Sequence, residues 1–320
     1  MKCPECASKH PYKYGMKCSC GYVFLFNPKA DHVSDGKFLA AIRRASANDT
    51  YFFTPNQLYA AYCRLTHKSA KWPLIIAIIL TIAAVICRIQ FSKQLSLVLG
   101  LAAIVIFVVA GVRALNRPLI RDTWDRYVSR WMADGRTKQL ARMITKPSLG
   151  TPPPEWQETD IYDYGVERLL IVDRELLVDL FVLNGVHAEQ RVLILAESGY
   201  PNYLLDVAGK SLRDNEQLPI FLLHDASTDG AQMERRVRAM KSLGVQEHRI
   251  IDLGLGPNDA KQMPNFRAVR HAHRAGEMPI DMLSVSGMIS VIGLSFETQM
   301  GMWAAIEQQR SQYGDTGSFG

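Results

Sequence analysis

The stretch Arg168-Leu169-Leu170-Ile171-Val172-Asp173 decides the fold class of the C-terminal half of this 320-residue chain. Its large apolar residues lie between two charged ones, which predicts a short strand buried on both faces. The next residues, Arg174–Asn184, have a helical pattern that ends before Gly185, a residue suited to helix termination. A buried strand followed directly by a helix is typical of a parallel sheet.

The alternation of strands and helices continues downstream. Further strands are predicted at 191–196, 218–225 and 249–253, with helices from Pro201 and over 231–243. This order predicts an α/β domain with a parallel sheet, and an apolar helix over 282–296 packed on it. The polar residues that end the strands are expected at one edge, where such sheets place their sites; they are Asp173, Glu197 and Asp225.

The residues after these strands resemble the Toprim domain of the topoisomerase VI A-subunit and meiotic-recombination-nuclease family. In that family an acidic residue ends the first strand, Gly-Tyr-Pro follows the second, and an Asp-x-Asp motif with a glycine follows the third. The resemblance covers residues 165–265. It rests on Val172-Asp173-Arg174-Glu175, Glu197-Ser198-Gly199-Tyr200-Pro201-Asn202, His224-Asp225-Ala226-Ser227-Thr228-Asp229-Gly230 and Leu253-Gly254-Leu255-Gly256-Pro257-Asn258-Asp259.

The resemblance implies a Mg²⁺ site for phosphodiester chemistry, with Asp173, Asp225 and Asp229 as the candidate catalytic residues. The pattern departs from the family where Ser227 replaces the second acid, and no domain with a catalytic tyrosine is identified. The alternative is that these acidic residues only cap helices and turns. We favour a degenerate, non-catalytic Toprim-like domain, with a Mg²⁺-dependent nuclease as the other interpretation.

Two apolar stretches lie side by side upstream of this domain. They run over 72–89 and 95–112, joined only by residues 90–94. Because each is about 18 residues long, near the lower limit for a membrane span, we predict a two-helix transmembrane hairpin. A pair of buried core helices is the alternative. Gly100 and Gly111 offer small-residue contacts through which the hairpin could form a homo-oligomer.

Charge is distributed unevenly around this hairpin. Residues 1–72 carry a balance of +7, residues 113–146 carry +6, and residues 147–320 carry −9, within a net charge of +6. By the positive-inside rule, both termini are expected in the cytoplasm and the chain in the inner membrane. The basic flanks suit anionic lipid, and nucleic acid is the other partner they suggest. Basic side chains also gather at Arg235, Arg236, Arg238 and Lys241, and at Arg267, Arg270, His271, His273 and Arg274.

The first 20 residues contain four of the six cysteines: Cys3, Cys6, Cys18 and Cys20. Two pairs of closely spaced thiols, with Gly21 where a positive φ is needed, resemble the two turns of a zinc ribbon. We predict a structural, four-sulfur zinc site. Disulfides are the alternative, disfavoured in a reducing cytoplasm, and His10 is a less favoured ligand.

The chain is therefore predicted to have several domains. They are a zinc ribbon (1–26), a small helical adaptor (27–71), the transmembrane hairpin (72–115), a juxtamembrane amphipathic helix with linker (116–150), the Toprim-like α/β domain (151–310) and a disordered tail (311–320). In the juxtamembrane segment, aromatic residues share one helical face, which could lie at the membrane interface or pack on the C-terminal domain.

Two functions fit this organisation. The first is a membrane-anchored cytoplasmic scaffold or sensor that binds a protein, nucleotide or nucleic-acid ligand. The second is a membrane-tethered nuclease that acts on invading DNA, as bacterial defence proteins with related modules do. Transport is disfavoured because Thr81 and Arg88 are the only inward-facing polar candidates in the spans.

Overall fold

A parallel four-stranded sheet forms the centre of the C-terminal region. The computed structural model describes residues 1–66, 71–90, 93–115, 118–152, 165–241, 243–245, 248–256, 258 and 277–313. The strands are β1 (Arg168–Val172), β2 (Val192–Ala196), β3 (Ile220–Leu223) and β4 (Ile250–Asp252), in the order β2-β1-β3-β4. Every neighbouring pair is parallel. The predicted α/β sheet is thus confirmed.

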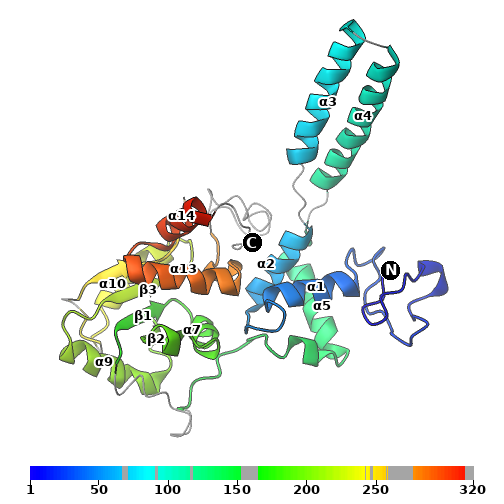
Figure 1. Ribbon diagram of the computed structural model, residues 1–320. Helices are drawn as coiled ribbons and strands as arrows, with labels where there is room; N and C mark the ends of the chain where they lie inside the picture. The colour runs from blue at the N-terminus through cyan, green and yellow to red at the C-terminus, as the bar shows by residue number, and fades with distance from the viewer. Residues whose placement is uncertain are drawn as a thin grey trace.

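Helices cover both faces of this sheet, because alternate residues of each strand point to opposite sides. On one face, Leu170 and Val172 pack with α7 (Glu175–Leu183), α13 (Val285–Thr298) and α14 (Met302–Tyr313). On the other face, Leu169 and Ile171 pack with α9 (Leu205–Asp214) and α10 (Met233–Arg238). The predicted packing of 282–296 on the sheet is confirmed, since α13 lies against the strands (Figure 1). The centre of the Phe296 ring is 4.7 Å from that of Phe221.

Short elements complete this domain. They are α8 (Val186–Glu189), η4 (Asn202–Leu204), η5 (Gly230–Gln232) and η7 (Ile280–Met282). Gly185 takes a φ of +78°, as expected of the residue that ends α7. The second predicted basic group, residues 267–274, lies outside the described residues.

Three helices build the N-terminal body: α1 (Asp35–Ala45), α2 (Pro55–Thr66) and α5 (Arg121–Ala133). Two tryptophans of α5 are fully buried between them. The ring of Trp124 stacks on Tyr62 at 4.2 Å, and the ring of Trp131 stacks on Phe38 at 4.6 Å. The predicted apolar face of α5 therefore packs on α1 and α2, a partner that neither sequence-based interpretation named.

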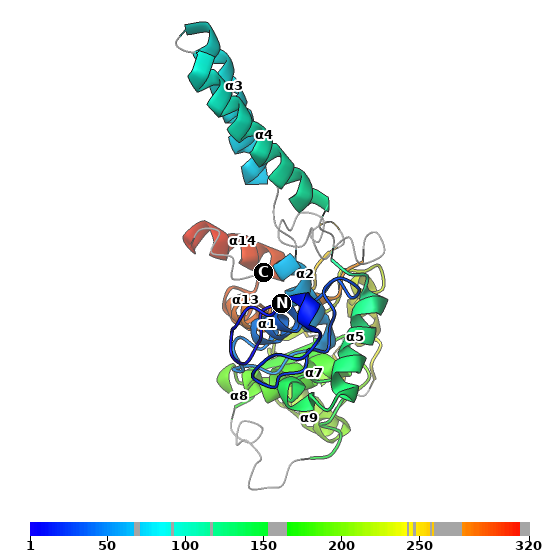
Figure 2. The same cartoon turned by 90° about the vertical axis from the view of Figure 1, so that its right-hand side faces the viewer.

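The two apolar stretches form α3 (Lys71–Gln90) and α4 (Lys93–Leu115), which run side by side and project from the body (Figures 1 and 2). Among the described residues, no helix combines the length and apolar character that crossing a membrane requires. The predicted transmembrane hairpin, and the inner-membrane localisation built on it, are therefore wrong. Charged residues limit α3 to the stretch 72–87, and polar ones limit α4 to 97–112, both short of about 20 consecutive apolar residues.

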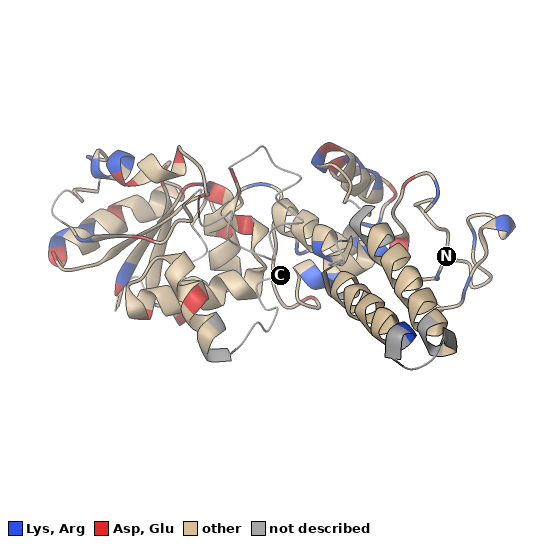
Figure 3. Ribbon diagram, turned by 90° about the horizontal axis from the view of Figure 1, so that it is seen from above, with Lys and Arg blue, Asp and Glu red and all other residues tan. Residues whose placement is uncertain are grey.

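The hairpin formed by α3 and α4 nevertheless presents apolar side chains outward. Between them the two helices carry almost no charge along their ribbons (Figure 3). Ile79 is 58% exposed, and Leu97 is 64% exposed. A continuous exposed apolar surface of this kind marks a place of contact with another molecule.

Candidate metal centre and the carboxylate edge of the sheet

Four cysteines come together at the N-terminus. The Sγ atoms of Cys3, Cys6, Cys18 and Cys20 all lie within 4.8 Å of one another. Cys3 Sγ is 3.5 Å from Cys20 Sγ, and Cys6 Sγ is 3.7 Å from Cys18 Sγ. Four sulfurs bound to tetrahedral Zn²⁺ would be about 3.8 Å apart, given a Zn–S distance of about 2.3 Å. The cluster could therefore hold a metal ion, with thiol donors that suit zinc.

Local backbone hydrogen bonds hold the chain in a tight turn at each pair of cysteines. The amide of Ala7 donates to Cys3 O, and the amide of Gly21 donates to Cys18 O, which closes one tight turn at each pair. Gly21 has a φ of +98°, as its position after the last cysteine predicted. His10 instead stacks on Phe24 and places Nε2 3.0 Å from Gly15 O. The cluster of donor atoms is made of the cysteines alone.

The four thiols affect one another's ionisation because they lie so close together. The backbone amide of Cys20 and the Ser8 hydroxyl lower the pKa of Cys18 to about 5. The Ser8 hydroxyl also lowers the pKa of Cys6. The backbone amide of Tyr22 lowers the pKa of Cys20, but burial and the neighbouring thiols together outweigh it and raise this pKa to about 12. A divalent cation would let all four ionise, because metal binding releases the remaining thiol protons.

Asp35 and Arg136 join this segment to the helical body. The Asp35 side chain is fully buried and accepts hydrogen bonds from the amides of Leu25 and Phe26, at 2.9 Å each. It also accepts from Tyr22 Oη at 2.7 Å and from Arg136 Nη1 at 3.1 Å. The chain that follows the cysteine cluster is thereby fixed to the start of α1.

A second group of polar side chains lies at the carboxyl edge of the sheet, as predicted. Asp173 follows β1 and Asp225 follows β3, and the Asp225 amide donates to Asp173 Oδ2 at 2.8 Å. Between these carboxylates lies Arg174. Its Nη2 is 2.6 Å from Asp225 Oδ1, and its Nε is 3.3 Å from Asp173 Oδ1. The structure thus brings together two of the three candidate catalytic residues around an arginine.

Asp281 extends this group to the N-terminal body. Its side chain is 3% exposed, and its Oδ1 lies 3.3 Å from Arg174 Nη2. Thr54 Oγ1 donates to Asp281 Oδ2 at 2.6 Å, and Asn56 Nδ2 donates to its Oδ1 at 2.9 Å. Thr54 also caps α2, since its Oγ1 accepts from the amide of Gln57. The edge of the sheet is therefore hydrogen-bonded to the start of α2.

Asp229, the third candidate, lies apart from the other two. Its side chain is 86% exposed and pairs with Arg236 Nη1 at 3.2 Å. Arg236 also holds Glu197, with 3.0 Å between Nη2 and Oε2. Among the described residues, the four cysteines are the one group of three or more cysteine, histidine or acidic side chains placed to share a metal ion.

Burial changes the ionisation of the carboxylates at this edge. It raises the pKa of Asp225 to about 7, against the opposing effect of Arg174, and Asp173 adds to the rise. Burial likewise raises the pKa of Asp173. Asp173 Oδ1 is buried and accepts no hydrogen bond within the described part of the chain. Perturbed carboxyls of this kind occur at functional sites and in structural ion pairs alike.

His224 packs tightly beneath the loops at this edge. Its Nε2 is 3.0 Å from Asp252 Oδ1, and its Nδ1 is 2.8 Å from Asp225 O. A Cβ atom at Gly254 or Gly230 would collide with the imidazole ring. Glycine is therefore required at position 230 of the Asp229-Gly230 motif for steric reasons, independently of catalysis.

Sequence reasoning missed Arg174 and Asp281 as members of this edge group. Arg174 could have been found, because a cation directly after a strand-end aspartate reaches the neighbouring strand end. Asp281 gave no such signal, since it is separated from Arg174 by 107 positions and belongs to a short turn.

No family model, curated protein or solved structure matches this chain. The fold and site define a mixed α/β protein with an N-terminal four-cysteine cluster, a helical region and a C-terminal parallel-sheet domain.

Proposed function

We propose that this protein is a non-catalytic scaffold, in which a structural zinc module and a Toprim-like domain are held as one unit for binding a partner. The observation that carries this proposal is the position of Arg174 between Asp173 and Asp225. In a Mg²⁺ enzyme the metal ion would occupy the space between these two carboxylates, because Mg²⁺ is bound through carboxylates and retained waters. Here a guanidinium neutralises the same carboxylates.

The zinc module has a structural role in this proposal. Four thiolates complete a tetrahedral shell and leave no open position for a substrate. The segment around the cluster has only a very small apolar core, formed by Cys3, Cys18 and Phe24. Metal binding would therefore supply folding free energy that this core lacks.

One observation favours the alternative of a Mg²⁺-dependent nuclease. Asp173 Oδ1 is buried and accepts no hydrogen bond within the described residues, and Arg174 Nε lies 3.3 Å from it, so a metal cation in place of the guanidinium would satisfy this oxygen. Movement of Arg174 would be required first. The alternative therefore predicts that loss of the guanidinium strengthens Mg²⁺ binding.

Calorimetric titration of Mg²⁺ and Mn²⁺ into the full chain distinguishes the two functions. The scaffold proposal predicts no saturable binding at millimolar metal and no cleavage of DNA. Saturable binding that Asp225→Ala removes, together with DNA cleavage, would overturn it. Glu234→Ala, which changes an exposed carboxylate of α10 by the same charge, is the matched control.

A further inference from the structure

The turn at residues 11–15 presents two aromatic rings to solvent. It is built around η1 (Tyr12–Tyr14), within the blue N-terminal segment that projects from the helical body (Figure 1). Tyr12 is 42% exposed, and Tyr14 is 66% exposed. The amide of Gly15 donates to Tyr12 O at 3.0 Å, which closes the turn. Rings held in the open in this way can stack on planar groups of another molecule.

A lysine ammonium group lies beside each of these rings. Lys29 Nζ is 5.0 Å from the centre of the Tyr12 ring. Lys13 Nζ is 4.9 Å from the centre of the Tyr14 ring. Asn27 Nδ2 donates to Tyr12 Oη at 2.7 Å, which fixes the position of that ring. Each ring therefore has a cation within reach of a group that stacks on it.

Two further lysines face each other next to this turn. Lys2 and Lys9 form an antiparallel bridge, with backbone hydrogen bonds on either side of the pair. In such a pair the two side chains are close together, with about 4.5 Å between the Cα atoms, and like charges directly opposite one another are destabilising. An anion held by both ammonium groups would remove this repulsion. Only His10 and Pro11 separate Lys9 from Tyr12 in the sequence.

The segment as a whole is basic. Its first 30 residues contain one acidic residue, Glu5, and five lysines: Lys2, Lys9, Lys13, Lys17 and Lys29. Within the described residues, none of these five ammonium groups forms a hydrogen bond or a salt bridge. The segment stays positive even with four thiolates and one Zn²⁺ in the cysteine cluster. Its lysines are therefore available to a polyanion.

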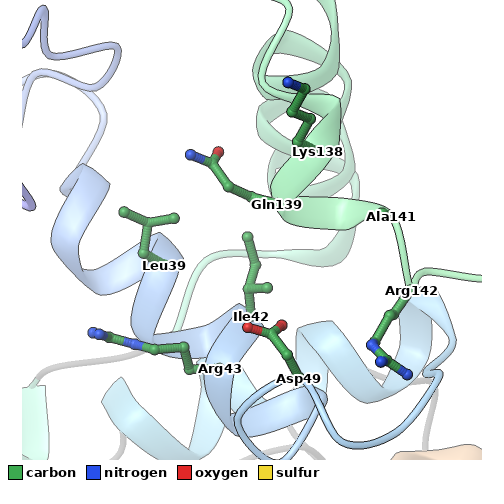
Figure 4. Close-up of a pocket in the computed structure, with 8 residues that line it drawn as sticks. All are labelled: Leu39, Ile42, Arg43, Asp49, Lys138, Gln139, Ala141 and Arg142. Atoms are coloured by element: carbon green, nitrogen blue, oxygen red, sulfur yellow. The ribbon is translucent and has the colours of Figure 1, made fainter.

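Two other basic groups of the chain are arranged differently. Arg43, Lys138 and Arg142 line a pocket beside α1, but their side chains point away from one another (Figure 4). On α10, two arginines are already paired with carboxylates. The N-terminal turn instead combines unpaired cations with exposed aromatic rings.

We propose that the tyrosines and lysines around this turn bind single-stranded nucleic acid. They form a tyrosine–lysine surface: Lys2, Lys9, Tyr12, Lys13, Tyr14 and Lys29. Unpaired bases stack on the rings, and backbone phosphates lie against the ammonium groups. The rings favour nucleic acid over an acidic peptide, which would use the lysines alone. This inference names a class of partner for the scaffold and rests on the proposed function.

Fluorescence anisotropy of a labelled oligothymidylate of about 20 nucleotides, titrated with the full chain without added Mg²⁺, tests the inference. Saturable binding is expected. It should weaken about tenfold between about 50 and about 200 mM salt, because phosphate contacts release counterions. A duplex of the same length should bind more weakly, since its bases are already stacked on one another, and polyglutamate should compete poorly.

Each contrary outcome has its own meaning. Absence of saturable binding would overturn the inference and leave the scaffold proposal standing. Equal binding of the duplex, or equal competition by polyglutamate, would also overturn it, the latter in favour of an acidic peptide. Cleavage of the oligonucleotide after Mg²⁺ is added would overturn the scaffold proposal instead.

A pair of variants at one exposed ring tests stacking. Tyr14→Leu should weaken binding about fivefold or more, because an aliphatic side chain does not replace a base–aromatic stack. Tyr14→Phe keeps the ring and should bind within about twofold of the wild type. Unchanged affinity in Tyr14→Leu would contradict the role of the tyrosine–lysine surface.

A pair of double variants separates this surface from general charge. Lys13→Gln with Lys29→Gln should weaken binding about fivefold or more. Lys210→Gln with Lys241→Gln removes the same charge from exposed positions of the sheet domain and should leave affinity within about twofold. An equal loss in both double variants would contradict a specific site.

Discussion

Asp35 illustrates how one buried side chain joins two parts of the molecule. Its carboxylate accepts hydrogen bonds from two backbone amides of the chain after the cysteine cluster, from the Tyr22 hydroxyl and from the Arg136 guanidinium. Asp35→Ala should therefore reduce the free energy of unfolding by about 3–5 kcal/mol. The reason is that the variant leaves the guanidinium and the buried donors without their acceptor. Chemical denaturation with urea measures this loss.

The control for this variant is Asp134→Ala. Asp134 pairs with the same arginine, at 2.6 Å, but its side chain is 41% exposed. Its removal should cost at most about 1 kcal/mol. Equal losses in the two variants would show that Arg136 alone, and not the buried carboxylate, joins the segments.

Asp225 gives a prediction about pH. Its folded-state pKa rises from 3.8 to about 7, mainly through burial. Between these values the folded state holds more protons than the unfolded state, so stability should fall as pH rises from about 4 to about 7 and then level off. Asp225→Asn should remove this part of the slope.

Thermal unfolding of the wild type and of Asp225→Asn across pH 4 to 8 measures the effect. The melting temperature of Asp225→Asn, relative to that of the wild type, should be higher at pH 7 than at pH 4. Each kcal/mol of difference in stability corresponds to about 2–4 °C. Parallel pH curves for the two proteins would contradict the raised pKa of Asp225.

At the scale of elements, the periodicity of apolar residues predicted which face of a helix is buried. It did not predict which other element packs against that face. The sequence places Trp124 and Trp131 on one face of α5, and the structure buries both against α1 and α2. A helical pattern specifies which side is covered, whereas the covering element is fixed only by packing of distant residues. The strands were predicted more fully, since an uninterrupted apolar run flanked by helices occurs in few other arrangements.

For the hairpin of α3 and α4, the apolar runs in the sequence predicted helices but were not sufficient to predict membrane spans. Sequence predicted the two helices, but the inference of membrane spans went further than the described helices support. We predict that its exposed apolar side chains pair with those of a second copy, through which the chain forms a homo-oligomer.

Substitution at this surface tests self-association. Leu101→Gln with Val108→Gln changes side chains that are 56% and 61% exposed. The oligomer should dissociate, because each polar substitution disfavours burial at the interface. Light scattering after size exclusion measures the mass. A wild type with the mass of one chain, or a variant with the wild-type mass, would contradict the prediction.

At the scale of the whole molecule, the N-terminal body and the sheet domain share one apolar core. Hydrogen bonds from Thr54 and Asn56 to Asp281 cross the junction, as do bonds between Asn184 and the backbone of Phe52. Sequence separated these parts by linkers and did not predict the junction, because contacts over more than 130 positions leave no local pattern. The cysteine cluster was predictable, since its donors lie within 18 residues of one another.

The zinc content of the full chain tests the central claim most directly. Elemental analysis of protein purified without chelators should find about one zinc per chain, as a closed four-sulfur site requires. Cys18→Ser should lose the metal, whereas Cys63→Ser, at a buried cysteine of α2 outside the cluster, should retain it. Wild-type protein without zinc, or Cys18→Ser with a full complement of zinc, would contradict the account.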